Sequence, residues 1–265
     1  MLTIKKYPLE DLDLQDCLES KVPLVIQTPG EWKLDELRDA LRSMQFSMYR
    51  FPHDVVACAR QDAVNSTTTL DEFLARQTEY RNDSEHVYKI ISNLDDSGFS
   101  QLAASFSALH GKFISSGRLD YRNLWVNFLG EGTRLHFDLP SAFNLQLIGQ
   151  KTYYIAKPGS RGYYPFSWLG GKGHCSKIPD IHHVDQERFP LFQKLEEKFH
   201  EVAVRQGEVM FIPSCWWHQV DSNEELNLNL TWGHINRPGT ARHPRQTLAG
   251  IVTYVYRTLF FPHIY

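Results

Sequence analysis

Residues 124–156 read LWVNFLGEGTRLHFDLPSAFNLQLIGQKTYYIA, a series of short apolar runs separated by Gly, Pro and Asn. After a long connection the pattern continues with HEVAVRQG at 200–207, EVMFIP at 208–213 and LNLNLTW at 226–232. Short strands at roughly even spacing, with turn residues between them, are typical of a β-sandwich or a β-barrel. The sequence therefore predicts a mainly β protein with flanking helices, whose core occupies residues 124–236.

The segments that flank this core have a mixed pattern. We expect a short apolar strand at 22–27 and helices at 32–44, 70–78 and 99–109. The helix at 70–78 follows a run of Ser and Thr and has Asp71 and Glu72 in its first turn. The whole chain is expected to form one structural domain, with an N-terminal α/β flank at 1–123 and a C-terminal helical tail at 237–265.

Two further segments stand out. The connection at 159–188 is rich in Gly and polar residues, and connections of this length are usually functional or disordered. Residues 246–261 carry apolar side chains at helical spacing, which predicts a helix that either packs on the domain or forms a homodimer interface. Those apolar residues are Leu248, Ile251, Val252, Val255, Leu259 and Phe260.

The composition is that of a soluble globular protein, with 42% hydrophobic residues, 22% charged residues, and 28 basic against 31 acidic side chains. This balance indicates no bulk attraction to nucleic acid or to a membrane. The cysteines form no Cys-x-x-Cys pair, which argues against a disulfide framework and against a thiolate zinc site. Neither a signal peptide nor a membrane-spanning apolar run is recognised, so a cytoplasmic location is expected. The cysteines are Cys17, Cys58, Cys175 and Cys215.

The sequence His136-x-Asp138 offers two metal-ligand side chains at positions i and i+2 of an expected strand, where both point to one face. A third ligand is available in His218, which follows the strand expected at 208–213. Two His and one carboxylate, with the other positions of the metal left open, suit Fe(II) oxygenases. A second such sequence, His183-x-Asp185, lies in the Gly-rich connection, and we interpret His183 as a solvated loop residue.

Four spaced features together resemble the JmjC family of cupin-like oxygenases, especially its asparaginyl-hydroxylase and tRNA-modifying-hydroxylase branches. In chain order they are Thr133-x-x-His136-x-Asp138, Gly149-x-Lys151, DQERFPLF at 185–192 and GEVMFIPSCWWH at 207–218. The resemblance covers about residues 125–232. It implies a double-stranded β-helix core, the jelly-roll of cupin and JmjC proteins.

The resemblance also implies roles for individual residues. His136, Asp138 and His218 would bind Fe(II). Lys151 would pair with the distal carboxylate of the cosubstrate 2-oxoglutarate, and Thr133 would donate a hydrogen bond to it. This agrees with the physical chemistry, because a buried carboxylate needs a cation and a hydroxyl to offset its desolvation.

Three other side chains are candidates for contact with the cosubstrate. Asn229 resembles the family's Asn three residues ahead of a Trp, and Asn127 and Tyr88 are further candidates. The sequence does not decide which face of the strand at 226–232 is inside. Related hydroxylases often carry Asn six residues after the first metal His, where this chain has Ala142, and Asn144 follows two residues later.

The function implied is a dioxygenase that uses Fe(II), 2-oxoglutarate and O2, hydroxylates a protein or peptide side chain, and releases succinate and CO2. Hydroxylation is preferred to demethylation because of the resemblance. A hydroxylase of tRNA or of a small molecule stays open, and so does a non-catalytic cupin-type binding module. A zinc or manganese cupin acting as an isomerase or hydrolase is a third alternative. No membrane partner is expected, and nucleic acid is not indicated.

Overall fold

The computed structural model describes residues 3–30, 32–52, 63–94, 102, 119–159, 161–167, 171–196, 199–235 and 237–260. Its N-terminal elements are β1 (Lys5–Pro8), α1 (Leu14–Glu19), β2 (Leu24–Gln27), α2 (Leu34–Leu41), β3 (Phe46–Pro52), β4 (Val64–Thr68), α3 (Leu70–Ala75), α4 (Gln77–Asn82) and β5 (His86–Asn93). The later strands are β6 (Leu119–Phe128), β7 (Gly132–Phe137), β8 (Ser141–Ile148), β9 (Gln150–Ala156), β10 (His200–Arg205), β11 (Glu208–Ile212), β12 (Trp217–Ser222) and β13 (Leu226–His234). The later helices include α7 (Gln193–Glu196), α8 (Arg237–Ala241) and α9 (Pro244–Phe260).

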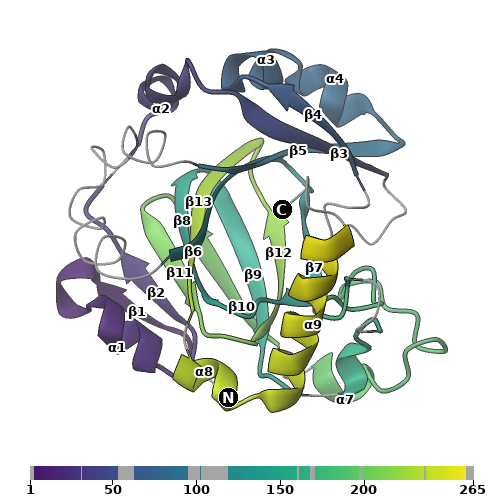
Figure 1. Ribbon diagram of the computed structural model, residues 1–265. Helices are drawn as coiled ribbons and strands as arrows, with labels where there is room; N and C mark the ends of the chain where they lie inside the picture. Colours follow the sequence, from purple (N-terminus) through teal and green to yellow (C-terminus); the bar gives the residue numbers. More distant parts are fainter. Residues whose placement is uncertain are drawn as a thin grey trace.

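The strands form two sheets that face each other (Figure 1). The larger has the order β1-β2-β11-β8-β13-β6-β5-β3-β4, and the smaller has the order β10-β9-β12-β7. This confirms the prediction of a mainly β jelly-roll core with flanking helices. The strands at the N-terminus, β1 to β5, extend the larger sheet, and of these the sequence pattern predicted only β2.

The strand β13 shows how the sequence separates the two faces of the larger sheet. Leu228, Leu230 and Trp232 belong to the hydrophobic cluster that includes buried side chains of α1 to α4 on the outside. The alternate residue Asn229 contacts Lys151 of the facing sheet, so it points into the space between the sheets. The question of the inner face is thereby resolved, and the polar side chains of β13 line the interior.

Two of the N-terminal helices, α1 and α3, begin at side-chain caps. Asp13 accepts a hydrogen bond from Asp16 N at the start of α1, and Thr69 accepts one from Glu72 N at the start of α3. Both are capping boxes, which satisfy backbone N–H groups that a helix start leaves open. The single helix expected at 70–78 is two helices, α3 and α4, that meet at Arg76. The helix expected at 99–109 lies, apart from residue 102, outside the described residues.

The predicted C-terminal helix is present as α9, which lies beside β7 on the outside of the smaller sheet (Figure 1). The helix packs on the domain, which was one of the two alternatives, but mainly not through the apolar residues that the periodicity selected. Ala249, Gly250 and Thr253 are its buried residues, because a close approach to the domain requires small side chains. The larger apolar residues Leu248, Ile251, Val255, Leu259 and Phe260 are exposed. A homodimer through this helix stays a prediction. Among the described helices, none is both long and apolar enough to cross a membrane.

The Gly-rich connection does not form a simple loop. It contains the short 3-10 helix Arg161–Tyr163, and Tyr163 stacks on Trp217 with ring centroids 4.9 Å apart. Further on, Ser176 N donates to Leu135 O at 2.9 Å and Phe137 N donates to His174 O at 3.0 Å. The connection therefore pairs with the edge of β7 that β12 leaves free.

The turn from β8 to β9 depends on Gly149, whose φ is 82°. A Cβ at this position would lie 2.4 Å from the carbonyl oxygen of Leu226 and 2.8 Å from Oδ1 of Asn227. Only glycine adopts this conformation at low cost and also leaves room for the neighbouring strand. The turn sets the position of Lys151, two residues later.

We predict that Gly149→Ala lowers the free energy of unfolding by roughly 2 kcal/mol or more, since it adds a clash to the strain of a positive φ. Gly130 is the matched control, because its φ is 78° and a Cβ there would meet nothing within 4 Å. Gly130→Ala should lose only about 1 kcal/mol. Urea denaturation of both variants tests this, and equal losses would contradict the clash.

Candidate metal centre

The structure brings together the three side chains selected as metal ligands. In the antiparallel pair of β7 and β12, His136 lies directly opposite His218. Their ring centroids are 4.2 Å apart, and Nε2 of His218 is 3.9 Å from Oδ2 of Asp138. One ligand atom from each of the three residues lies within 4.8 Å of the other two.

The backbone around the triad fixes this arrangement. His218 belongs to its own strand, β12, rather than to a segment trailing β11. Between the two strands Cys215 adopts a φ of 67°, and its N–H donates to the carbonyl oxygen of Asp138 at 2.8 Å. This turn holds the backbone of Asp138 against the start of β12.

Both imidazoles are oriented by the same kind of hydrogen bond. Nδ1 of His136 lies 2.7 Å from the carbonyl oxygen of Arg134, and Nδ1 of His218 lies 3.1 Å from that of Trp216. A carbonyl only accepts, so Nδ1 carries the proton and Nε2 keeps its lone pair for the centre. Burial, together with the neighbouring His136, lowers the pKa of His218 to about 4, so that ring is neutral at pH 7.

The competing sequence His183-x-Asp185 forms no such group. The side chain of His183 is 86% exposed, and its Nδ1 lies 2.8 Å from Oδ2 of Asp180. The interpretation of His183 as a solvated loop residue is confirmed.

Lys151 lies on β9, deep between the two sheets. Its ammonium donates to Oδ1 of Asn127 at 2.9 Å and to Oδ1 of Asn229. Burial, and secondly the charge of Lys89, lower the pKa of Lys151 from 10.5 to about 7. An ammonium has three donors, so the contacts to the two amides leave it one donor for a ligand.

Thr133 faces the same interior as His136, although the two are three positions apart in the sequence. The pairing of β7 with β12 shifts between His218, which lies opposite His136, and Val220, which lies opposite Thr133. This bulge adds one residue to β7 and so turns Thr133 to the inner face. Its Oγ1 is buried and has no hydrogen-bond partner among the described residues.

The candidates for cosubstrate contact separate clearly. Asn127 and Asn229 both accept hydrogen bonds from the ammonium of Lys151. Tyr88 instead stacks on Tyr80, with ring centroids 4.3 Å apart, and its hydroxyl donates to Asp83 at 2.7 Å. From Asn229 a chain of hydrogen bonds runs through Thr231 to Asn144.

Ala142 and Asn144 lie two residues apart on β8 and therefore share a face. Ala142 is buried, and Asn144 supplies an amide to the interior network at the next position of that face. An amide is thus present near the site, displaced along the strand from the position that the resemblance gave.

Sequence reasoning missed two charged residues beside Lys151. Lys89 on β5 is buried and donates to the carbonyl oxygen of Gly132, and Glu131 accepts from Phe128 N at 3.0 Å. Burial lowers the pKa of Lys89 to about 8 and raises that of Glu131. The sequence signal for Lys89 was a lysine within the apolar run 87–91, but the strand that contains it, β5, was not predicted.

Comparison with known proteins identifies the family. The sequence profile of the cupin-like domain matches residues 21–236. The chain belongs to this family. Relatives of this cupin-like chain include tRNA wybutosine-synthesizing protein 5 of Gallus gallus, 33% identical over 101 residues, which are 38% of this chain and 30% of that protein. Another is JmjC domain-containing protein C of Dictyostelium discoideum, 31% identical over 121 residues, 43% of this chain and 28% of that protein.

A third relative is lysine-specific demethylase JMJ30 of Arabidopsis thaliana, 30% identical over 125 residues, 46% of this chain and 28% of that protein. The resemblance to JmjC proteins is therefore confirmed. The cupin-like chain spans less than a third of the length of each of these relatives.

Lys151 is expected to destabilise the metal-free protein. The pKa shift from 10.5 to about 7 corresponds to a destabilisation of roughly 5 kcal/mol. The hydrogen bonds to the two amides, which the substitution removes, stabilise the protein by roughly 2 kcal/mol. Lys151→Met should therefore increase the free energy of unfolding at pH 7 by roughly 1–3 kcal/mol. Lys177→Met, at an exposed lysine, is the control and should change it by less than about 0.5 kcal/mol.

The pH dependence gives the same prediction a second measurement. Since the folded-state pKa of about 7 lies below the unfolded value near 10.5, the unfolded chain binds more protons between them. The stability of the parent should thus rise with pH through this window, and the contribution of Lys151 to that rise should be absent from the Met variant. Parallel pH profiles would contradict the assignment.

Proposed function

We propose that this chain is an Fe(II)- and 2-oxoglutarate-dependent dioxygenase that hydroxylates a protein or peptide side chain. The observation that carries the proposal is the placement of the His136, Asp138 and His218 group and the buried Lys151 on one inner surface. In the pairing of β12 with β9, Lys151 lies opposite Ser222, four residues along β12 from His218.

The donor set favours iron. Two neutral imidazole nitrogens and one carboxylate, with further positions left open, are the ligands of non-haem Fe(II) oxygenases. The hydrogen bonds from Nδ1 of His136 and His218 to backbone carbonyls fix both rings in the metal-binding orientation. We propose His136, Asp138 and His218 as the ligands.

The polar groups farther along the strands fit a dicarboxylate cosubstrate. Lys151 has a donor to spare, and the buried Oγ1 of Thr133 has no partner among the described residues. A buried polar atom without a partner is costly, so a ligand carboxylate would satisfy both groups at once. We propose Lys151 and Thr133 as its anchors, with Asn229 and Asn127 positioning the ammonium.

When bound, iron and 2-oxoglutarate would supply the activation of O2 and the oxidation of the substrate, with release of succinate and CO2. The chain itself holds both and excludes water. Val220 on the inner face of β12, and Trp216 just before this strand, are buried in an apolar cluster with Tyr153 of β9. No acid or base from the chain is needed beside the triad.

The substrate class rests on the resemblance to JmjC hydroxylases. One relative is named as a tRNA wybutosine-synthesizing protein and another as a lysine-specific demethylase, which keeps a tRNA substrate and demethylation as alternatives. A cupin that binds without catalysis, or that holds zinc, is a further alternative and is separated by the next experiment.

We predict that anaerobic Fe(II) binds the purified protein in a one-to-one ratio and that 2-oxoglutarate then produces an absorption band in the visible. The band arises because the oxo-acid chelates the metal. Visible spectroscopy under nitrogen measures it. Retention of zinc with no band would favour the zinc alternative, and binding of neither metal would favour a non-catalytic module.

A pair of histidine variants tests the ligand assignment. His136→Ala should abolish Fe(II) binding and the uncoupled formation of succinate from 2-oxoglutarate, since it removes one of three ligands. His183→Ala should leave both unchanged, because that side chain is exposed and lies in the connection. Calorimetry with Mn(II) and chemical detection of succinate provide the two readouts. The opposite pattern would reject the chosen triad.

A further inference from the structure

A cavity of about 680 Å³ lies at the ends of β7 and β12 that are remote from the metal centre. Its lining includes Gly132, Thr133 and Arg134 of β7, and Gln219, Asp221 and Ser222 of β12. The metal-ligand group and Lys151 are absent from its described lining. We call this space the rear cavity.

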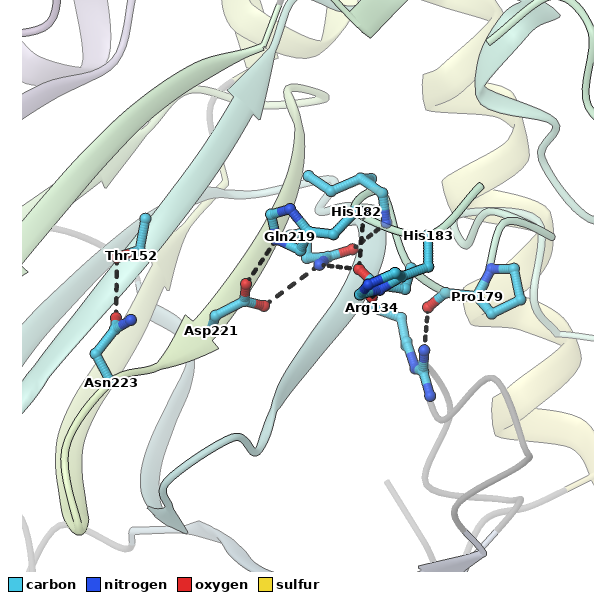
Figure 2. A network of polar contacts seen from close by, with 10 residues as sticks. Arg134, Thr152, Pro179, His182, His183, Gln219, Asp221 and Asn223 are labelled. Atoms are coloured by element: carbon cyan, nitrogen blue, oxygen red, sulfur yellow. Dashed lines mark hydrogen bonds and ion pairs between the residues drawn. The ribbon is translucent and has the colours of Figure 1, made fainter. Parts of the chain in front are cut away.

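The rim of the rear cavity is a network of paired side chains (Figure 2). Nε2 of His182 lies 2.9 Å from Oδ2 of Asp221, and Gln219 donates to Oδ1 of Asp180 at 2.9 Å. Arg134 donates to the carbonyl oxygen of Pro179. Since these rim carboxylates have partners, the groups at the inner end decide which ligand fits.

The inner end of the rear cavity presents hydrogen-bond donors without partners. Ser222 is 3% exposed and lines the cavity, and its Oγ has no hydrogen-bond partner among the described residues. Oγ1 of Thr133 is likewise buried and has no hydrogen-bond partner among the described residues. Because directly opposed residues share a face, Ser222 also lies next to Lys151.

Lys89 adds a positive charge to this inner end. It is 5% exposed, it lines the rear cavity, and its Nζ lies 5.9 Å from the ring centre of Phe51. Its hydrogen bond to the Gly132 carbonyl oxygen uses one of three ammonium donors. Glu131 also lines the rear cavity, and one of its carboxylate oxygens accepts a hydrogen bond from Phe128 N at 3.0 Å.

We propose that Lys89 and Ser222 form a second carboxylate-binding position at the inner end of the rear cavity, beside the position at Lys151. One ammonium and one hydroxyl are donors that a desolvated carboxylate requires, and the Thr133 hydroxyl stays assigned to the carboxylate at Lys151. Two sources fit this chemistry: a small carboxylate that enters through the rear cavity, or the distal end of an oxo-diacid longer than 2-oxoglutarate. Only the second source rests on the proposed function.

Succinate is the probe for the first source. Its binding is measured by calorimetry on the metal-free Lys151→Met protein, in which the carboxylate position at Lys151 has lost its ammonium. Succinate should bind, and adding Lys89→Met should weaken binding about tenfold or more, since a buried charge-assisted hydrogen bond is lost. Adding Glu131→Gln instead should tighten binding several-fold, because it removes a neighbouring negative charge. If Lys89→Met impairs folding, Ser222→Ala replaces it, with a loss of about threefold expected.

For the second source, the otherwise unmodified protein is loaded with Mn(II) and titrated with 2-oxoglutarate and with 2-oxoadipate, which is one methylene longer. If the longer diacid reaches the rear position, Lys89→Met weakens 2-oxoadipate about tenfold and 2-oxoglutarate much less. The proposal is overturned if Lys89→Met and Ser222→Ala change neither the succinate nor the 2-oxoadipate affinity. A failed Mn(II) titration with intact succinate binding would reject the proposed function and leave the rear position standing.

Discussion

The antiparallel pairing of β7 with β12 is the constraint on which the rest of the site depends. Its register sets His136 opposite His218, and the single extra residue in β7 brings Thr133 to the same inner face. A slip of one residue would turn every one of these side chains to the outside. The bulge is therefore part of the site, because a regular strand cannot present residues three apart on one face.

The interior that this register creates is unusually polar for a space between two sheets. Lys151, Asn127, Asn229 and Thr231 are buried there, whereas the outer face of the larger sheet is covered by the helices and is apolar. Buried polar groups of this kind lower stability unless each finds a partner. Such a cost is typical of binding sites, where the ligand supplies the missing partner.

Charge is distributed along the interior in an order that follows the strands. His136, His218 and Asp138 lie at one end of β7 and β12, Lys151 lies farther along, and Lys89 with Glu131 lies at the far end. Burial lowers the pKa of both lysines, and the charge of Lys89 lowers that of Lys151 further, so an anion beside them would relieve both. Lys151 and Ser222, which lie opposite each other on β9 and β12, thus connect the candidate metal centre to the rear cavity.

The sequence by itself determined the strand-rich core, the i and i+2 geometry of His136 and Asp138, and the choice of His218, because these follow from local periodicity and from a resemblance carried by short motifs. It also located Lys151, since a lysine at the start of an apolar strand needs a partner. The tertiary structure alone decided what depends on pairing between distant segments. Examples are the inward face of Asn229, the bulge that turns Thr133, and the approach of Lys89 to Lys151 from a strand of weak pattern. The packing face of α9 was also outside the reach of sequence, because close packing selected Ala249 and Gly250 over the larger apolar residues that periodicity favours.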